Sequence, residues 1–146
     1  MLDLLFTEVQ RMHPIVVAFP LALLVVSVLL DLFARFRPAL RASGRLTLYL
    51  GTWGAALATI TGLITHLRYE GTPAADFIDQ HEFVAYITTA IFLGLSIWRS
   101  RAMRRGKDIG ELWMYSILSV AGLVALVLTG ALGGNLVFGH AVGVLH

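Results

Sequence analysis

The sequence contains no cysteine among its 146 residues, and only 14% of its residues are charged. The absence of thiols excludes disulfide frameworks, iron–sulfur clusters, thiolate zinc sites, covalently attached haem and cysteine nucleophiles. The low charge excludes an ordinary soluble domain, in which about 25% of residues are charged. With 58% hydrophobic residues and a mean hydropathy of +0.79, so short a chain would leave much apolar surface in water. We therefore expect the lipid bilayer to be its solvent.

Four long stretches have no charged residue and are separated by shorter polar segments. They comprise residues 14–30, 46–65, 83–98 and 112–139. Each has about the length of the ~20 residues that cross the ~30 Å hydrocarbon core of a bilayer. The pattern predicts an all-α fold, an integral membrane four-helix bundle formed by a single domain over residues 1–146. Once polar ends are included, we expect helices at about 12–34, 46–69, 80–100 and 110–139.

Basic residues gather in two of the three connections between these stretches. Nine of the eleven lie in the first and third connections: Arg35, Arg37, Arg41, Arg45, Arg99, Arg101, Arg104, Arg105 and Lys107. The second connection carries Arg68 among several acidic residues. The positive-inside rule therefore predicts an up-down bundle with the first and third connections in the cytoplasm and the N-terminus and C-terminus outside. Because topology explains the arginines, we expect no nucleic-acid partner.

Four of the five histidines fall at predicted helix ends that share one side of the membrane. His13 opens the first helix, His66 closes the second, His81 opens the third and His140 lies late in the fourth. Consecutive helices run antiparallel, so all four ends lie on the outer side. At 1.5 Å per residue, the first three histidines agree in depth to within about one helical turn. His140 reaches that level only if the last helix bends near Gly133-Gly134 or starts deep on the cytoplasmic side.

Prolines and local charge pairs give further expectations about the first helix. Pro14 suits the first helical position, where its missing N–H costs nothing. Pro20 lies well inside the span and is expected to kink it. Asp31 is expected to pair with Arg35 one turn later. Tyr115, in the fourth span, is expected to be a packing or interfacial residue.

The four histidines together favour a ligand site. One histidine at a helix end is usually an interfacial residue, but ionisable groups near the membrane interior are costly and usually functional. Histidines that face inward from separate helices hold haem or metal in many bundles. Haem b, in one or two copies, fits best because two neutral imidazoles supply its axial ligands without cysteine. Zinc or copper is the alternative, with Glu82 or Asp79 as added ligands, and spacing does not separate the two options.

The predicted function is a small membrane b-type cytochrome, or a haem-bearing subunit of a redox complex. The inner half of the predicted bundle has no histidine, so we expect electrons to pass between membrane quinone and an extracytoplasmic partner. Such a chain is an electron-transfer protein rather than a stand-alone enzyme. In a simple bundle His13 faces His81, and His66 faces His140. The alternatives are a non-haem metal-binding membrane protein, or a cofactor-free structural or assembly subunit of a larger complex or homo-oligomer.

Two stretches near the ends of the chain resemble the signature motifs of a known family. The first runs from His13-Pro14 through Phe-Pro-Leu-Ala-Leu at 19–23 to Asp31-Leu32. The second is Gly-Gly-Asn-Leu-Val-Phe-Gly-His at 133–140, followed by Ala-Val-Gly-Val at 141–144. Both resemble the DUF2231 family of predicted four-helix bacterial membrane proteins, although that family more often has glycine at Ala141 and aspartate near His66. The resemblance covers nearly the whole chain. It implies a multi-pass protein of the bacterial inner membrane whose cofactor-binding histidines are His13, His66, His81 and His140.

Overall fold

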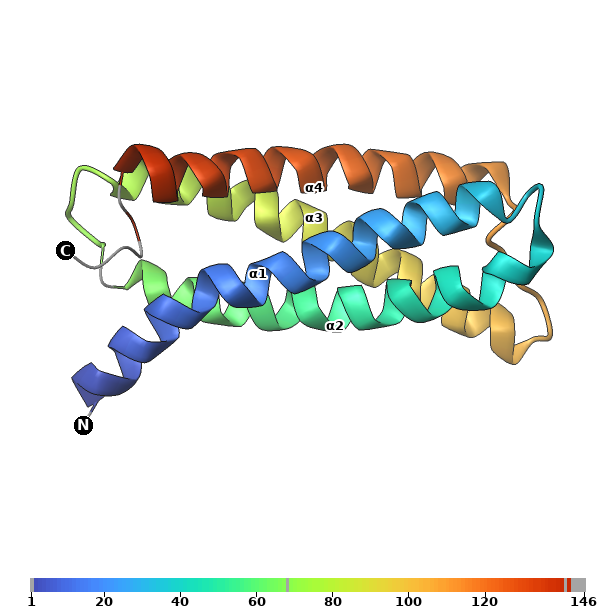
Figure 1. Ribbon diagram of the computed structural model, residues 1–146, viewed down its shortest axis with the longest axis horizontal. Helices are drawn as coiled ribbons and strands as arrows, with labels where there is room; N and C mark the ends of the chain where they lie inside the picture. The colour runs from blue at the N-terminus through green and yellow to red at the C-terminus, as the bar shows by residue number, and fades with distance from the viewer. Residues whose placement is uncertain (1, 68, 141, 143–146) are drawn as a thin grey trace.

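The structure is a computed structural model that describes residues 2–67, 69–140 and 142. The described residues form four long α-helices and no strand, which confirms the all-α prediction (Figure 1). The helices are α1 Leu2–Phe33, α2 Arg41–His66, α3 Ala75–Arg104 and α4 Trp113–His140, with a 3₁₀ turn η1 at Pro38–Leu40. They run alternately up and down to form one elongated bundle.

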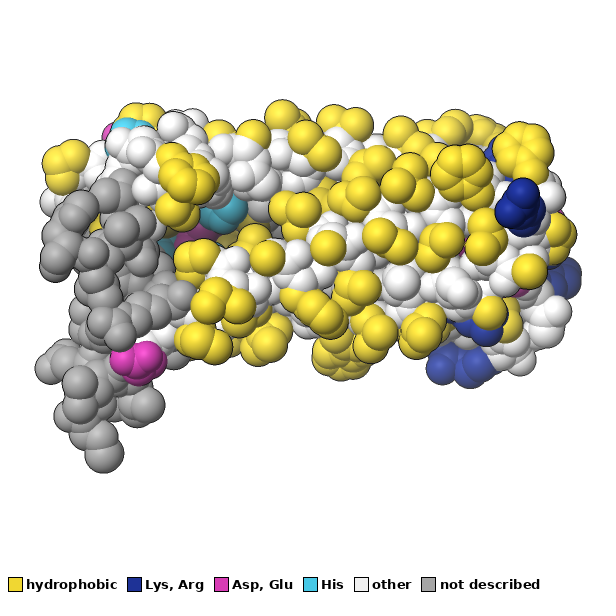
Figure 2. Space-filling view, viewed as in Figure 1, with side chains coloured by type: hydrophobic (Ala, Val, Ile, Leu, Met, Phe, Trp, Pro, Cys, Tyr) yellow, Lys and Arg dark blue, Asp and Glu magenta, His cyan; other side chains and the backbone are white. Residues whose placement is uncertain are grey.

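The outer surface of the bundle is apolar along most of its length. Large hydrophobic side chains such as Phe19, Trp53 and Val127 are more than half exposed. Hydrophobic side chains cover most of the visible face between the two ends of the bundle (Figure 2). Four segments are long and apolar enough to cross a bilayer: Met12–Phe33, Pro38–His66, Ala75–Arg104 and Trp113–His140. A soluble protein rarely exposes apolar patches of this extent. Lipid therefore covers this surface, as the composition predicts.

The bundle is built from two helical hairpins. α1 packs most extensively on α2, and α3 packs most extensively on α4, whereas the described parts of α1 and α3 lie diagonally opposite each other. Glycine allows the close approach within each hairpin. A Cβ atom on Gly51 of α2 would lie 2.7 Å from the Leu24 side chain of α1. A Cβ atom on Gly122 of α4 would lie 3.1 Å from Phe92 of α3.

The first three helices begin earlier than predicted. α1 begins at Leu2, so Pro14 lies inside the helix rather than at its first position. α2 and α3 begin at Arg41 and Ala75, about one turn earlier than expected, because each helix continues through its polar end beyond the charge-free stretch. α4 continues as a helix through Gly133-Gly134. The glycine pair does not break it, since glycine is tolerated in membrane helices that pack on neighbours.

The main buried core fills the middle of the bundle and its arginine-rich end. It contains Leu24 and Val28 of α1, Leu48 of α2, Phe92 of α3 and Leu126 of α4. A second, smaller cluster formed by Ile78, Leu136 and Val142 lies toward the histidine end. Between the two clusters the helices enclose open space rather than a continuous core, and that space is the candidate site.

Candidate functional site

A cavity of about 340 Å³ lies between the four helices near the histidine end of the bundle. Aliphatic, proline and glycine residues form most of its wall. Figure 2 shows the surface hollowed at this end, with histidine and acidic side chains visible inside the hollow. The titratable side chains that line the cavity are His13, His66, His81, Glu82 and Tyr86. Three of the four predicted site histidines therefore meet around one cavity, and each comes from a different helix.

His13 is held by the neighbouring helix of its own hairpin. Its Nδ1 atom lies 2.8 Å from the hydroxyl oxygen of Thr61 on α2. The Thr61 hydroxyl donates its own proton to the carbonyl of Ala58 at 3.0 Å. When the hydroxyl proton is directed at that carbonyl, the hydroxyl oxygen accepts from His13, and the tautomer consistent with both contacts carries the imidazole proton on Nδ1. The ring also lies over Gly62, where a Cβ atom would be 3.3 Å from Cε1 of His13.

His81 is held by the other helix of the second hairpin, through a backbone carbonyl instead of a hydroxyl. Its Nδ1 atom lies 3.1 Å from the backbone carbonyl of Thr129 on α4, and a carbonyl can only accept, so Nδ1 carries the proton. The ring lies against Gly133, where a Cβ atom would be 3.0 Å from Cε1 of His81. In the part of the chain that the structure describes, Nε2 of His13 and Nε2 of His81 have no hydrogen-bonding partner. Both nitrogens keep a lone pair available to a ligand.

The two histidines have threonine partners at the same separation along the chain. His13 and Thr61 are 48 positions apart, as are His81 and Thr129. A shift of 68 residues converts the first pair into the second. Each hairpin therefore places an imidazole of its first helix beside a threonine of its second helix.

His66 also lines the cavity, but carboxylates engage both of its ring nitrogens. Nδ1 lies 3.0 Å from Oε2 of Glu82, and Nε2 lies 3.6 Å from Oδ1 of Asp79. The Tyr86 hydroxyl donates to the same Glu82 oxygen at 3.0 Å. His66 therefore belongs to an ion-paired network at the edge of the cavity, and it does not repeat the arrangement of His13 and His81.

His140 does not join the other histidines. Its exposed ring stacks on Phe77, with ring centroids 4.2 Å apart, and it does not line the cavity. The expected bend at Gly133-Gly134 is absent, so the straight α4 carries His140 past the level of the cavity. α2 and α4 do lie diagonally opposite each other, but the expected pairing of His66 with His140 is not formed. Residues 141, 143 and 144 of the second signature motif lie outside the described residues.

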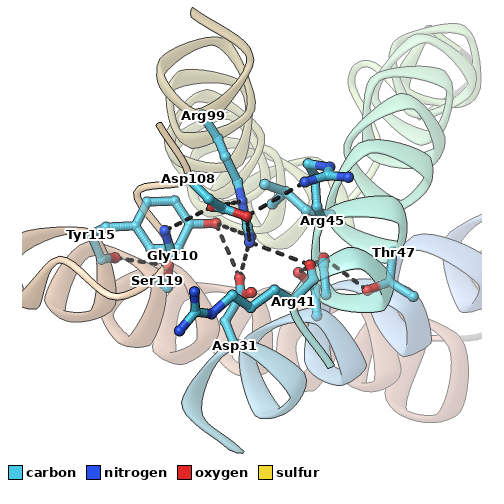
Figure 3. Close-up of polar contacts among 12 residues, drawn as sticks. Asp31, Arg41, Arg45, Thr47, Arg99, Asp108, Gly110, Tyr115 and Ser119 are labelled. Atoms are coloured by element: carbon cyan, nitrogen blue, oxygen red, sulfur yellow. Dashed lines mark hydrogen bonds and ion pairs between the residues drawn. The ribbon is translucent and has the colours of Figure 1, made fainter. Parts of the chain in front are cut away.

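A second polar cluster lies at the opposite end of the bundle (Figure 3). Arg99 of α3 is fully buried and donates to the carboxylate of Asp31 on α1 at 2.6 Å. It also donates to Asp108 at 3.0 Å and to the Tyr115 hydroxyl at 3.2 Å. The predicted pairing of Asp31 with Arg35 is wrong, because Asp31 faces the interior while Arg35 lies beyond the end of α1. Tyr115 packs in the core as expected and also donates to Asp31.

Asp108 links this cluster to the loop between α3 and α4. Burial disfavours its charged form, but hydrogen bonds from Arg99 and from the Gly110 backbone N–H outweigh burial. The pKa of Asp108 therefore lies below its ordinary value. Arg45 of α2 approaches the same carboxylate at 3.5 Å. These contacts connect the loop to the start of α2 and the end of α3. The sequence does not indicate the contact with Arg45, because Arg45 and Asp108 are far apart in the chain.

Gly44 provides a test of how tightly this cluster is packed. A Cβ atom on Gly44 of α2 would lie 2.5 Å from Oδ1 of Asp31. We expect Gly44→Ala to destabilise the detergent-purified protein by about 1–3 kcal/mol, since overpacking forces buried groups to shift. Thermal unfolding followed by circular dichroism measures the loss. Gly94→Ala is the matched control, because a Cβ atom on Gly94 of α3 meets nothing within 4 Å in the described structure. Equal melting temperatures for the two variants would contradict the packing described here.

The fold and the cavity together define a class: a four-helix membrane protein with a histidine-lined cavity near one end of its bundle. Within that class, the model of the family described as "Predicted membrane protein (DUF2231)" matches residues 10–146. The chain belongs to this family, which confirms the resemblance seen in the two signature motifs. No curated protein and no solved structure matches the chain.

Proposed function

We propose that the chain is a small membrane b-type cytochrome, or the haem-bearing subunit of a redox complex. It would pass electrons between membrane quinone and an extracytoplasmic partner. One observation carries the proposal: His13 and His81, on diagonally opposite helices, line one apolar cavity with Nδ1 anchored and Nε2 available. A hydrogen bond from the second ring nitrogen is the usual accompaniment of a metal-ligating histidine, because it fixes the tautomer and increases ligand basicity.

The volume and the lining of the cavity support the proposal of a cofactor site. Its volume of about 340 Å³ lies within the range of about 300–1,000 Å³ for small-molecule and cofactor sites. Its wall is mainly apolar, and Gly62 and Gly133 leave room beside the two imidazoles. His13 and His81 would hold the haem iron, one from each hairpin, which favours one haem rather than two. When bound, haem supplies one-electron redox chemistry.

The number of available ligands favours haem over a non-haem metal. Among the described residues, no group of three or more histidine, aspartate or glutamate side chains is placed to hold a metal ion. Zinc sites use three or four protein ligands, whereas bis-histidine haem needs two. His66 and Glu82 would serve another purpose beside the cofactor, which is to hold a proton between Nδ1 and Oε2, 3.0 Å apart.

Absorption spectroscopy tests the proposal directly. Protein purified in detergent from cells supplied with a haem precursor is expected to show a Soret band, with α and β bands that sharpen on reduction. A pyridine haemochrome assay is expected to give one haem per chain, because among the described residues a single pair of imidazoles is anchored across the cavity. A preparation with no Soret band would overturn the haem proposal and favour a cofactor-free structural or assembly subunit.

A further inference from the structure

A second groove lies between α1 and α4 at the arginine-rich end, far from the histidine cavity. It has a volume of about 340 Å³ and is lined by Leu32, Arg35, Trp113, Ser116, Ile117 and Val120. No acidic side chain lines it. Basic side chains gather at this end of the molecule, beside the apolar surface that faces lipid (Figure 2). The groove therefore combines an apolar floor with a positive charge at the level where the helices end.

The guanidinium group of Arg35 is held by one hydrogen bond, and most of its N–H donors have no partner among the described residues. One of its nitrogens donates to the Ser116 hydroxyl at 2.7 Å, which holds the side chain across from α1 to α4. Arginine has five N–H donors. Apart from the one that contacts Ser116, the donors of Arg35 have no hydrogen-bonding partner among the described residues. Two acidic residues lie near the groove residues along the chain, and both have other partners: Asp31 is ion-paired with Arg99, and Glu111 is ion-paired with Arg41. Arg35 is thus free of carboxylate partners in the described structure and available to an external anion.

We propose that this groove binds one anionic phospholipid. The lipid phosphodiester would accept hydrogen bonds from Arg35, whose planar fork matches phosphate oxygens. One acyl chain would lie along Leu32, Ile117 and Val120. Trp113 is 68% exposed at the rim, the position that tryptophan favours at a membrane–water interface. Basic pockets between transmembrane helices are known to bind anionic headgroups. This inference does not depend on the haem site.

Native mass spectrometry with a defined lipid pair tests the inference. The detergent-purified protein is mixed with equal amounts of phosphatidylglycerol and phosphatidylcholine that carry identical acyl chains. We expect retention of phosphatidylglycerol to exceed that of phosphatidylcholine about tenfold, because both headgroups carry the phosphodiester but the choline cation of phosphatidylcholine neutralises its charge and repels the nearby guanidinium group. Arg35→Gln is expected to remove the preference. Arg35→Lys, which keeps the charge and loses the fork, is expected to retain only part of it.

Arg104→Gln is the matched control, because Arg104 is exposed at the same end of the bundle and lies outside the groove. It should leave the lipid preference unchanged. Equal retention of both lipids by the wild-type protein would overturn the proposal, as would an equal loss of preference in the Arg35 and Arg104 glutamine variants. Retention of neither lipid would also overturn it and would leave the groove to a protein partner.

Discussion

Arg99→Leu is expected to cause the largest loss of stability of any single substitution at the arginine-rich end. Arg99 is fully buried and contacts two carboxylates, of which Asp31 is itself only 6% exposed. Removing one member of a buried ion pair costs about 3–5 kcal/mol because it leaves an uncompensated charge. Whole proteins are stable by only about 5–15 kcal/mol. The variant should therefore yield little monodisperse protein in detergent, measured by size-exclusion chromatography, and the remainder should melt at a much lower temperature.

Two further variants isolate the cause of that loss. Arg101→Leu removes an exposed arginine two positions along α3, and we expect it to change stability by no more than about 0.5 kcal/mol. Adding Asp31→Asn to Arg99→Leu removes the unpaired buried charge and should recover part of the loss, since replacing both partners is often close to neutral. If Arg99→Leu melted at the same temperature as Arg101→Leu, the buried ion pair would not stabilise the bundle.

Loss of haem from His13→Ala and His81→Ala is the largest expected effect at the other end. Each substitution removes one of the two anchored imidazoles, so the iron would keep at most one axial ligand. Substitution of the hydrogen-bonding partners of metal ligands alone costs about 10–100-fold in affinity. Loss of a ligand should exceed that range and abolish the low-spin bis-histidine spectrum. Haem content per purified chain, from the pyridine haemochrome assay, measures the effect.

The remaining histidines provide matched controls for this experiment. His140→Ala should retain full haem content, since His140 stacks on Phe77 outside the cavity. His66→Ala should also retain haem, because both nitrogens of His66 face carboxylates. Thr61→Val removes only the acceptor for His13 and should lower haem affinity about tenfold without preventing ligation. Equal haem loss in all four histidine variants would contradict the assignment of His13 and His81 and would indicate a general folding defect.

The architecture could be predicted from the sequence because hydropathy and charge are local properties. Charge-free stretches of membrane-spanning length define four helices, and antiparallel succession brings helix ends such as His13, His66 and His81 to one level. Contacts between residues that are far apart in the chain could not be predicted in this way. The expected partner of Asp31 was Arg35, one turn away, yet the actual partner is Arg99 on a helix two connections later. A rule based on helical spacing cannot detect a partner that only tertiary packing provides.

The structure brings three of the four predicted site histidines to one cavity and places His140 outside it. The sequence required either a bend near Gly133-Gly134 or a deep cytoplasmic start of the last helix to bring His140 to the level of the others. In the bundle Gly133 instead lies against the ring of His81, and the helix continues without interruption. The glycine serves as space for a neighbouring imidazole rather than as a break. A single-helix argument cannot distinguish these roles, since they differ only in what lies across the interface.

The ion pair between Asp31 and Arg99 joins the two hairpins. Its two residues are 68 positions apart, as His13 and His81 are. These two residues occupy equivalent positions in the two hairpins, with opposite charges that meet inside the bundle. If two copies of the first hairpin associated in the same way, two Asp31 carboxylates would face each other without a cation. Two copies of the second hairpin would bring two buried guanidinium groups together. The ion pair thus favours association of the first hairpin with the second and disfavours homotypic association of either hairpin with a copy of itself.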